Sequence, residues 1–361
     1  MLNFAHMNCI LANFSHDLAL ARNCEFYTPP VNVRVMEHDL AGLSRYFGSG
    51  DLSYNPGAPV WGWNLSFARQ LRRVGNVDLP NDSELVEIRS LASRKTAVEV
   101  LKLLRETLPE LPLCGESFFC GSESELDVCL TEKGRYVLKS PLSGSGRGLR
   151  FVKGQLSETQ RKWALRCIKE QTGVVVEPFY NKTADFALEF VVEEKEVTYK
   201  GLSVFETNSN NVYAGNLLRP QNILWKILLN YFDSNVYCTL IDELLKILQE
   251  KFVGHYKGPL GVDMMIVCEK GQLRIHPCVE INVRRTMGFL SLDLAKLVSS
   301  SVKAKFSLLY EKGAGKLLEI ARTSPLPEYD GQGLLHGGVM FLTPVNEDSH
   351  FTAIIEVLPP K

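Results

Sequence analysis

Two runs that read as β-strands, 261–267 and 273–282, lie on either side of a Lys-Gly pair at 270–271. Such a pair is a plausible two-residue hairpin turn. The runs therefore predict an antiparallel hairpin in which Glu269 faces Gln272. This hairpin constrains the fold strongly, because it requires an antiparallel sheet with one face open to polar side chains.

The predicted register brings acidic side chains together. Counting inward from the turn places Asp263 opposite Cys278 and makes Glu280 a diagonal neighbour of Asp263. Such neighbours lie roughly 7–8 Å apart at the backbone, so the two carboxylates could share magnesium, with the Asn282 amide as a neutral oxygen ligand. Pro277 cannot donate to a ladder, so we expect an edge or a bulge there, and a bulge would shift this register. The alternative interpretation is a solvated hairpin with acidic residues on its wet face.

A glycine-rich segment at 143–148 separates a predicted strand at 135–138, which ends before Lys139, from a returning strand at 149–153. The spacing fits neither a Walker loop nor a dinucleotide fingerprint, because Leu149 stands where each needs another residue type, and a protein kinase has its lysine downstream. Glycines let backbone N–H groups close on phosphate oxygens, and the lysine adds a positive charge. A simple glycine-rich hairpin turn is the alternative.

A third element is the apolar run 173–176, which ends in Glu177-Pro178-Phe179-Tyr180 before alternation resumes at 185–189. A strand that breaks into a linker between two lobes exposes backbone groups with which an adenine edge can pair. Pro178 lacks an N–H group but keeps its carbonyl, so it can still accept a hydrogen bond.

In this order, the motifs resemble those of the ATP-grasp superfamily over residues 93–290. The resemblance implies an α/β (α+β) fold: an N-terminal α/β domain at 1–90, a small lobe with the glycine-rich loop at 91–178, and a C-terminal lobe with a metal site at 179–361. It also implies that ATP binds with Mg²⁺ or Mn²⁺ between the lobes. The implied reaction is phosphorylation of a substrate carboxylate, followed by attack of an amine or thiol on the acyl phosphate.

The same resemblance assigns roles to individual residues. Arg284 matches a position that holds the transferred phosphate or the acyl phosphate. Many members carry a further phosphate-binding lysine, and here the corresponding stretch offers only Arg219. The metal ligands would be Asp263, Glu280 and Asn282. The nucleotide contacts would be Lys95, Lys139, Ser143, Gly144, Ser145, Gly146, Gly148, Glu177, Pro178, Phe179, Tyr180 and Asp185.

The N-terminal segment carries a polar turn, Asn-Phe-Ser-His-Asp at 13–17, after a predicted strand at 8–12. With Tyr-Thr-Pro-Pro at 27–30, this turn resembles a group of bacterial ATP-grasp proteins, a resemblance that names no substrate. His16 is a candidate acid, base or substrate ligand, and the alternative is a structural histidine beside an N-cap at Ser15 or Asp17. The Trp-Gly-Trp run at 61–63 either lines a substrate cleft or packs under a loop.

Regular elements are expected elsewhere along the chain. Apolar periodicity and capping signals favour helices, and two apolar runs near the end favour strands around a polar loop. The expected helices are 96–106, 157–171, 223–231, 238–252 and 292–300, and the expected strands are 338–342 and 351–357.

The chain has 361 residues, too many for one compact core, so two or three lobes are expected. A net charge of −1 argues against nucleic-acid or membrane partners. Nine cysteines without Cys-x-x-Cys spacing favour reduced thiols in the cytoplasm, and the first residues lack the basic region of a signal peptide. The expected partners are a small-molecule carboxylate and an amine or thiol. A homodimer is possible as well. A phosphotransferase that releases a phosphorylated product, and a nucleotide-binding protein without turnover, are the alternatives.

Overall fold

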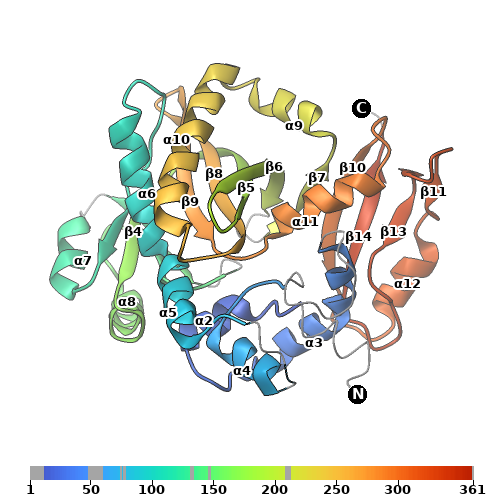
Figure 1. Cartoon of the computed structure of the whole chain (residues 1–361), viewed down its shortest axis with the longest axis horizontal. Coiled ribbons are helices and arrows are strands. Elements are labelled where there is room, and N and C mark those ends of the chain that lie inside the picture. The colour runs from blue at the N-terminus through green and yellow to red at the C-terminus, as the bar shows by residue number, and fades with distance from the viewer. Residues whose placement is uncertain are drawn as a thin grey trace. The chain divides into compact units, whose positions relative to one another are not determined.

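The computed structural model describes residues 12–47, 60–73, 75, 79–130, 134–144, 148–207 and 213–359. Figure 1 shows the helices and strands of the chain. The chain divides into two compact units. Unit 1 comprises Met1–Asp82, Gly201–Ile227 and Arg284–Lys361, and unit 2 comprises Ser83–Lys200 and Leu228–Val283. Both contain helices and antiparallel strands, so the predicted α+β class is confirmed. The predicted boundaries at 90 and 178 stay a prediction.

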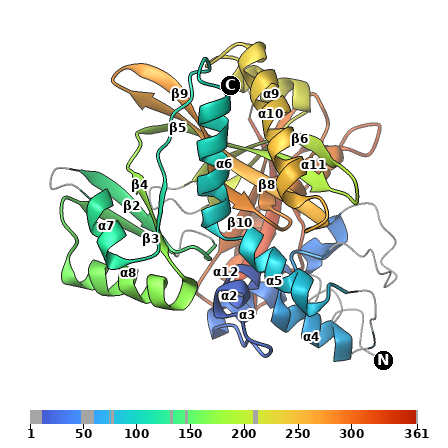
Figure 2. The same ribbon diagram turned by 60° about the vertical axis from the view of Figure 1, so that its left-hand side comes forward.

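Unit 2 contains a small antiparallel sheet in the order β1-β4-β2-β3. Helices α7 (Glu123–Cys129) and α8 (Glu158–Gln171) lie beside this sheet (Figure 2). Ser157 and Gln160 form the capping box at the start of α8, as predicted. The strands are β1 (Phe118–Cys120), β4 (Val174–Pro178), β2 (Arg135–Lys139) and β3 (Leu149–Lys153). The buried core beneath them consists of Cys120, Leu126, Leu138, Val152, Ala164, Cys167, Val174 and Val176.

A second group of unit 2 strands, in the order β5-β8-β9, carries the predicted hairpin. The two strands of the hairpin meet at Lys270 (φ 51°) and Gly271 (φ 81°), both in the left-handed region that a type I′ turn requires. Glu269 faces Gln272, as predicted. The strands are β5 (Lys182–Val192), β8 (Gly258–Glu269) and β9 (Gln272–Asn282), and α6 (Arg94–Thr107) packs on β9 and on α10 (Ser234–Phe252).

The register beyond the middle of this hairpin differs from the prediction. Asp263 pairs directly with Glu280 and not with Cys278, because the ladder is irregular between Asp263 and Met265. Three residues of β9, centred on Cys278, replace one residue of β8, and Pro277 lies within this irregularity. The pairing partner of Asp263 moves by two residues, from Cys278 to Glu280, so the side chains still point to the predicted face of the strand. Asp263 and Glu280 extend from the same face of the hairpin as direct neighbours.

Unit 1 is built on an antiparallel arrangement in the order β13-β14-β10-β7. Its strands are β7 (Tyr213–Leu218), β10 (Lys303–Tyr310), β13 (Val339–Phe341) and β14 (Phe351–Leu358), with a small pair β11 (Glu328–Tyr329) and β12 (Leu335–Gly337). Its helices are α2 (His16–Arg22), α3 (Val31–Leu40), η1 (Ala41–Tyr46), α4 (Leu65–Arg73), α11 (Met287–Leu294), η2 (Ala295–Leu297) and α12 (Lys316–Thr323).

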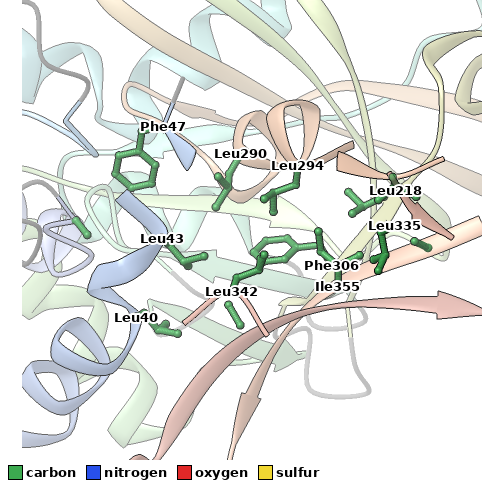
Figure 3. Packing of buried hydrophobic residues seen from close by; sticks show 14 of the residues in the cluster. Leu40, Leu43, Phe47, Leu218, Leu290, Leu294, Phe306, Leu335, Leu342 and Ile355 are labelled. Atoms are coloured by element: carbon green, nitrogen blue, oxygen red, sulfur yellow. The ribbon is translucent and has the colours of Figure 1, made fainter. Parts of the chain in front are cut away.

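The core of unit 1 joins segments that are distant in sequence. Leu43 and Phe47 from the N-terminal helices pack with Leu290 of α11 and Phe306 of β10 (Figure 3). This packing explains why the N-terminal helices belong to the same unit as the last strands. Three elements cross the boundaries between the units, namely α5 (Asp82–Leu91), β6 (Val197–Thr207) and α9 (Gln221–Leu228).

Most predicted elements are present, with shifted ends. Helix α11 begins at Met287, five residues before the predicted start at Leu292, because the Thr286 hydroxyl accepts a hydrogen bond from the Phe289 N–H (2.8 Å) and caps it. The predicted strand at 8–12 lies almost wholly outside the described residues. Within the described parts of the chain, no helix is long and apolar enough to cross a membrane.

Candidate functional site

The β8–β9 hairpin of unit 2 places three oxygen-bearing side chains together. Asp263 and Glu280 form a direct cross-strand pair. The Asn282 amide donates from Nδ2 to Asp263 Oδ2 (3.1 Å), which leaves its Oδ1 as a neutral oxygen ligand. Within the described residues, no group of three or more His, Cys, Asp or Glu side chains is arranged to hold a metal. A cation here would therefore have two carboxylates, one amide and oxygens from a ligand or water.

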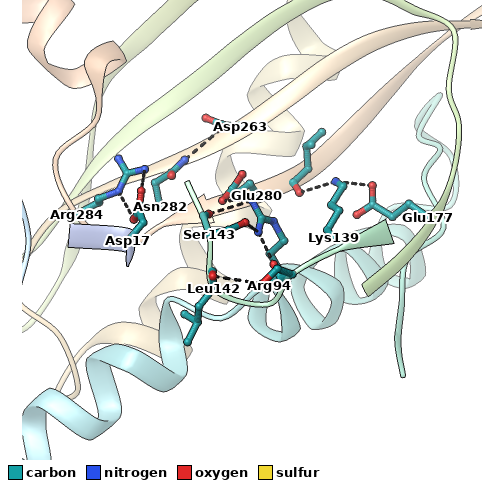
Figure 4. A network of polar contacts seen from close by, with 12 residues as sticks. Asp17, Arg94, Lys139, Leu142, Ser143, Glu177, Asp263, Glu280, Asn282 and Arg284 are labelled. Carbon is teal, nitrogen blue, oxygen red and sulfur yellow. Dashed lines mark hydrogen bonds and ion pairs between the residues drawn. The ribbon is translucent and has the colours of Figure 1, made fainter. Parts of the chain in front are cut away.

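Arg94, the first residue of α6, contacts this site through an ion pair that the sequence did not predict. Its Nη2 lies 2.7 Å from Glu280 Oε1, and the arginine side chain is 5% exposed against 26% for the glutamate. The same guanidinium donates to Ser143 Oγ (2.7 Å) and to the Ser143 carbonyl (3.2 Å) (Figure 4). It also donates to the Ser140 carbonyl. One side chain therefore joins Glu280 to the segment that enters the glycine-rich loop.

Lys139 at the end of β2 lies against Glu177 of the neighbouring strand β4. Lys139 Nζ is 2.6 Å from Glu177 Oε2, and both side chains are almost fully buried. The lysine also approaches the Val279 carbonyl (3.5 Å), and the Ser117 hydroxyl donates to Glu177 Oε1 (3.0 Å). Lys139 and Glu177, both predicted nucleotide contacts, thus form one ion pair in this structure.

The neck of the glycine-rich loop is closed by backbone contacts. The Ser140 N–H donates to the Gly148 carbonyl (2.8 Å) across the loop. A Cβ atom at Gly148 would lie 2.0 Å from Ser143 Oγ, so only glycine fits there. Gly144 lies on the entering side, and Ser145 and Gly146 fall outside the described residues.

The other predicted nucleotide contacts are more dispersed. Lys95 is exposed and lies over the Phe119 ring, 5.6 Å from its centroid. The Phe179 N–H donates to the Arg135 carbonyl (2.8 Å). Pro178 ends β4 opposite Tyr136. Asp185 on β5 pairs with Lys182, and Arg219 follows β7 in unit 1.

Tyr180 contacts a buried histidine that the sequence did not single out. Its ring meets that of His276 edge to face at 5.4 Å, and its hydroxyl accepts from the Glu116 N–H (2.7 Å). His276 is fully buried with no hydrogen-bond partner at either ring nitrogen among the described residues. Burial lowers its pKa to about 4, partly offset by Glu177, so the ring is neutral near pH 7.

In unit 1 the predicted phosphate-binding arginine is held by a carboxylate. Arg284 Nε lies 2.8 Å from Asp17 Oδ1 and Nη2 lies 3.0 Å from Oδ2, which makes a forked pair (Figure 4). The guanidinium carbon is 5.7 Å from the centroid of the Trp61 ring. Trp61 is buried against Phe14 and Phe47, so it packs under the segment instead of lining an open cleft.

His16, the neighbour of Asp17 in α2, is buried and its protonation follows from its contacts. Asn64 Oδ1 accepts from the Phe67 N–H (3.0 Å), so the amide turns its Nδ2 toward His16 Nδ1 (3.2 Å). This orientation assigns Nδ1 as the acceptor and the ring proton to Nε2, which has no partner among the described residues. Burial lowers the His16 pKa to about 4, against the opposing effect of Asp17. Ser15 occupies the N-cap position without a side-chain cap bond.

No protein-family model and no curated protein matches the chain. Solved structures that the chain resembles include N5-carboxyaminoimidazole synthetase from Staphylococcus aureus complexed with ADP, at 14% identity over 75% of this chain and 68% of that chain (TM-score 0.43). Biotin carboxylase from Campylobacter jejuni is 13% identical over 76% of this chain and 64% of that chain (TM-score 0.46). The biotin carboxylase domain of the Hydrogenobacter thermophilus 2-oxoglutarate carboxylase is 15% identical over 92% of this chain and 76% of that chain (TM-score 0.48).

These neighbours are ATP-grasp enzymes, the superfamily that the sequence motifs resemble.

Proposed function

We propose that the chain is an ATP-grasp ligase that uses MgATP to phosphorylate a substrate carboxylate, which an amine or thiol then attacks. The observation that carries this proposal is the direct pairing of Asp263 with Glu280 on β8 and β9, with the Asn282 amide beside them. Magnesium is commonly bound by one or two carboxylates together with substrate phosphates, and this set matches that pattern. The ion would neutralise charge on the phosphates.

Lys139 and Glu177 fit the nucleotide part of this proposal. An ammonium group held by one buried carboxylate is a point charge that phosphate oxygens can share. Glu177 keeps the ammonium in place when no nucleotide is bound, so the site is preorganised. Pro178, which ends the same strand, retains a carbonyl for the adenine amino group.

For the second substrate we propose the unit 1 cluster around His16. A histidine with a pKa of about 4 is neutral near pH 7, so it cannot serve as a general acid there. Its Nε2–H group is a donor, and an acceptor oxygen of a carboxylate or phosphoryl group would satisfy it. We therefore assign His16 to substrate binding and assign Arg284 to the developing negative charge.

The described cysteines are free thiols, which agrees with a cytoplasmic location.

The proposal is tested by binding first and by chemistry second. Millimolar MgATP should raise the melting temperature of the wild type, and ATP with a chelator should not, because binding confined to the native state stabilises it. Lys139→Ala should bind ATP more weakly, and the hairpin control Glu269→Gln should respond like wild type. An unchanged melting curve in MgATP would contradict the nucleotide site.

The chemistry is read from products after incubation with MgATP and a metabolite library. A ligated mass together with ADP or AMP supports the ligase. A released phosphorylated product with no ligated mass would instead identify a phosphotransferase.

A further inference from the structure

The guanidinium of Arg94 is the meeting point of three segments of unit 2. It contacts Glu280 Oε1 at 2.7 Å on β9, Ser143 at Oγ (2.7 Å) and at the carbonyl, and the Ser140 carbonyl. The backbone N–H of Arg94 also donates to the Pro141 carbonyl (2.9 Å). The start of α6 is thereby tied both to the metal-face carboxylate and to the entry of the glycine-rich loop.

The loop entry is held from its other side by Gln171, the last residue of α8. Gln171 Oε1 accepts from the Leu142 N–H (2.8 Å) and from the Ser140 hydroxyl (2.9 Å). With the Ser140 N–H bonded to the Gly148 carbonyl, the neck is a fixed structure. A shift of the Arg94 guanidinium would therefore weaken its hydrogen bonds to Ser140 and Ser143.

Charge makes Glu280 the dominant partner of Arg94. An arginine is always protonated, and this one is 5% exposed with Nε lacking a hydrogen-bond partner among the described residues. Glu280 is the one acidic side chain in ion-pair contact with it in the described parts of the chain. The buried cation therefore depends on this carboxylate.

We propose that Arg94 is a positioning residue that acts as the resident counter-ion of Glu280 and couples the metal site to the neck of the glycine-rich loop. A divalent cation that arrives without nucleotide has to compete with the guanidinium for the carboxylate. This inference rests on the proposed metal role of Glu280. The forked shape of arginine is required, because a lysine at this position can supply the charge but cannot reach the carboxylate and both serines at once.

The test is a titration of the nucleotide-free protein with Mn²⁺ alone, in which electron paramagnetic resonance measures the free Mn²⁺ and so gives the affinity. Arg94→Gln should bind Mn²⁺ at least about tenfold more tightly than wild type, because a nearby positive charge is removed. Arg94→Lys should keep the wild-type Mn²⁺ affinity. In both variants, amide hydrogen exchange at Ser140 and Leu142, whose N–H groups make the bonds of the neck, should be faster. The control Arg161→Gln removes an arginine paired with Glu123 and Asp127 elsewhere in unit 2 and should change neither readout.

Failure of this inference is distinguishable from failure of the metal site. If Glu280→Gln leaves Mn²⁺ binding unchanged, the proposed metal site is wrong. If Glu280→Gln weakens Mn²⁺ binding while Arg94→Gln leaves it unchanged or weaker, the counter-ion role is wrong. Should Arg94→Gln not fold, Arg94→Lys decides: faster exchange at the neck with unchanged Mn²⁺ affinity supports the coupling, and unchanged exchange overturns it.

Discussion

The charged clusters of the two units hold their arginines differently. In unit 2, Arg94 contacts one carboxylate oxygen of Glu280, and its guanidinium also donates hydrogen bonds to Ser140 and Ser143. In unit 1, Arg284 contacts Asp17 through both carboxylate oxygens. A forked pair engages both carboxylate oxygens, whereas a single-oxygen pair leaves the other oxygen of the carboxylate able to take a second cation. With the roles proposed above, Glu280 in unit 2 is the more exchangeable partner and Asp17 in unit 1 is the more fixed one.

Each unit also buries a neutral histidine against a glycine. A Cβ atom at Gly62 would lie 2.8 Å from the His16 ring, and one at Gly115 would lie 2.7 Å from the His276 ring. His16 has one bonded ring nitrogen, and both ring nitrogens of His276 lack partners in the described parts of the chain. Because burial lowers the pKa of both rings to about 4, the two should behave alike in titration.

The largest expected effect is the loss of stability in acid. Both histidines have a pKa of about 4 in the folded chain, below the ordinary value of 6.5. Between these values the unfolded chain binds more protons, so stability falls as the pH drops from about 6.5 to about 4, by several kcal/mol in total. Asp17 and Arg284 act on His16 with opposite signs, and Glu177 and Lys139 do so on His276. Urea unfolding measured across this pH range checks the slope.

Substituting one histidine at a time shows how much of the loss of stability in acid comes from each unit. His16→Asn and His276→Gln should each remove about one proton from the uptake on unfolding, since one ring titrates in each unit. A slope that neither variant changes would show that other groups cause the acid loss.

Gly115→Ala should be the most destabilising of the single substitutions considered, at about 3 kcal/mol. The residue has φ +106°, which alanine rarely adopts, and its new Cβ would clash with His276. Gly254→Ala is the control, because Gly254 has φ +84° with nothing within 4 Å, so only the backbone cost of about 1 kcal/mol applies. Equal losses of unfolding free energy in the two variants would mean that His276 is not tightly packed.

Glu280→Gln should destabilise the nucleotide-free protein by about 2 kcal/mol, because it leaves the buried Arg94 cation without its carboxylate. The sequence alone predicts no loss of stability, or a small gain, for Glu280→Gln, because Asp263 and Glu280 without a cation would repel each other. Thermal unfolding without ligand distinguishes the two. Glu269→Gln, near the turn of the same hairpin, should change nothing, and a wild-type melting point for Glu280→Gln would restore the repulsion argument.

Asp17→Asn should have the smallest effect, about 1 kcal/mol, because both partners of the unit 1 pair are partly exposed. Its stabilisation by MgATP should match wild type, since the pair belongs to the site proposed for the second substrate. Loss of the MgATP response in this variant would remove the distinction between the two clusters.

The sequence was informative where the physics is local. The two-residue turn at Lys270 and Gly271 and the capping box at Ser157 depend on neighbouring residues, and both are confirmed. Pro277 correctly indicated an irregular ladder, but its extent was not readable, so Asp263 was paired with the wrong residue. Thr286 was a signal for the start of α11 that the prediction did not use.

Long-range partners account for what the sequence did not predict. Arg94 and Glu280 are 186 positions apart, and nothing near Arg94 distinguishes it from the exposed Lys95 beside it. His276 alternates with apolar residues in its strand and carries no motif. Its burial against Gly115 and Tyr180 follows only from the fold.

The central claim is that Asp263, Glu280 and Asn282 bind the metal that accompanies ATP. The most direct test is calorimetric titration of ATP into wild type and Glu280→Gln, each with Mg²⁺ and with a chelator. Wild type should bind ATP tightly only with Mg²⁺, and Glu280→Gln should lose most of that metal-dependent affinity. Equal ATP affinity with and without Mg²⁺, or an unchanged metal dependence in Glu280→Gln, would contradict the claim.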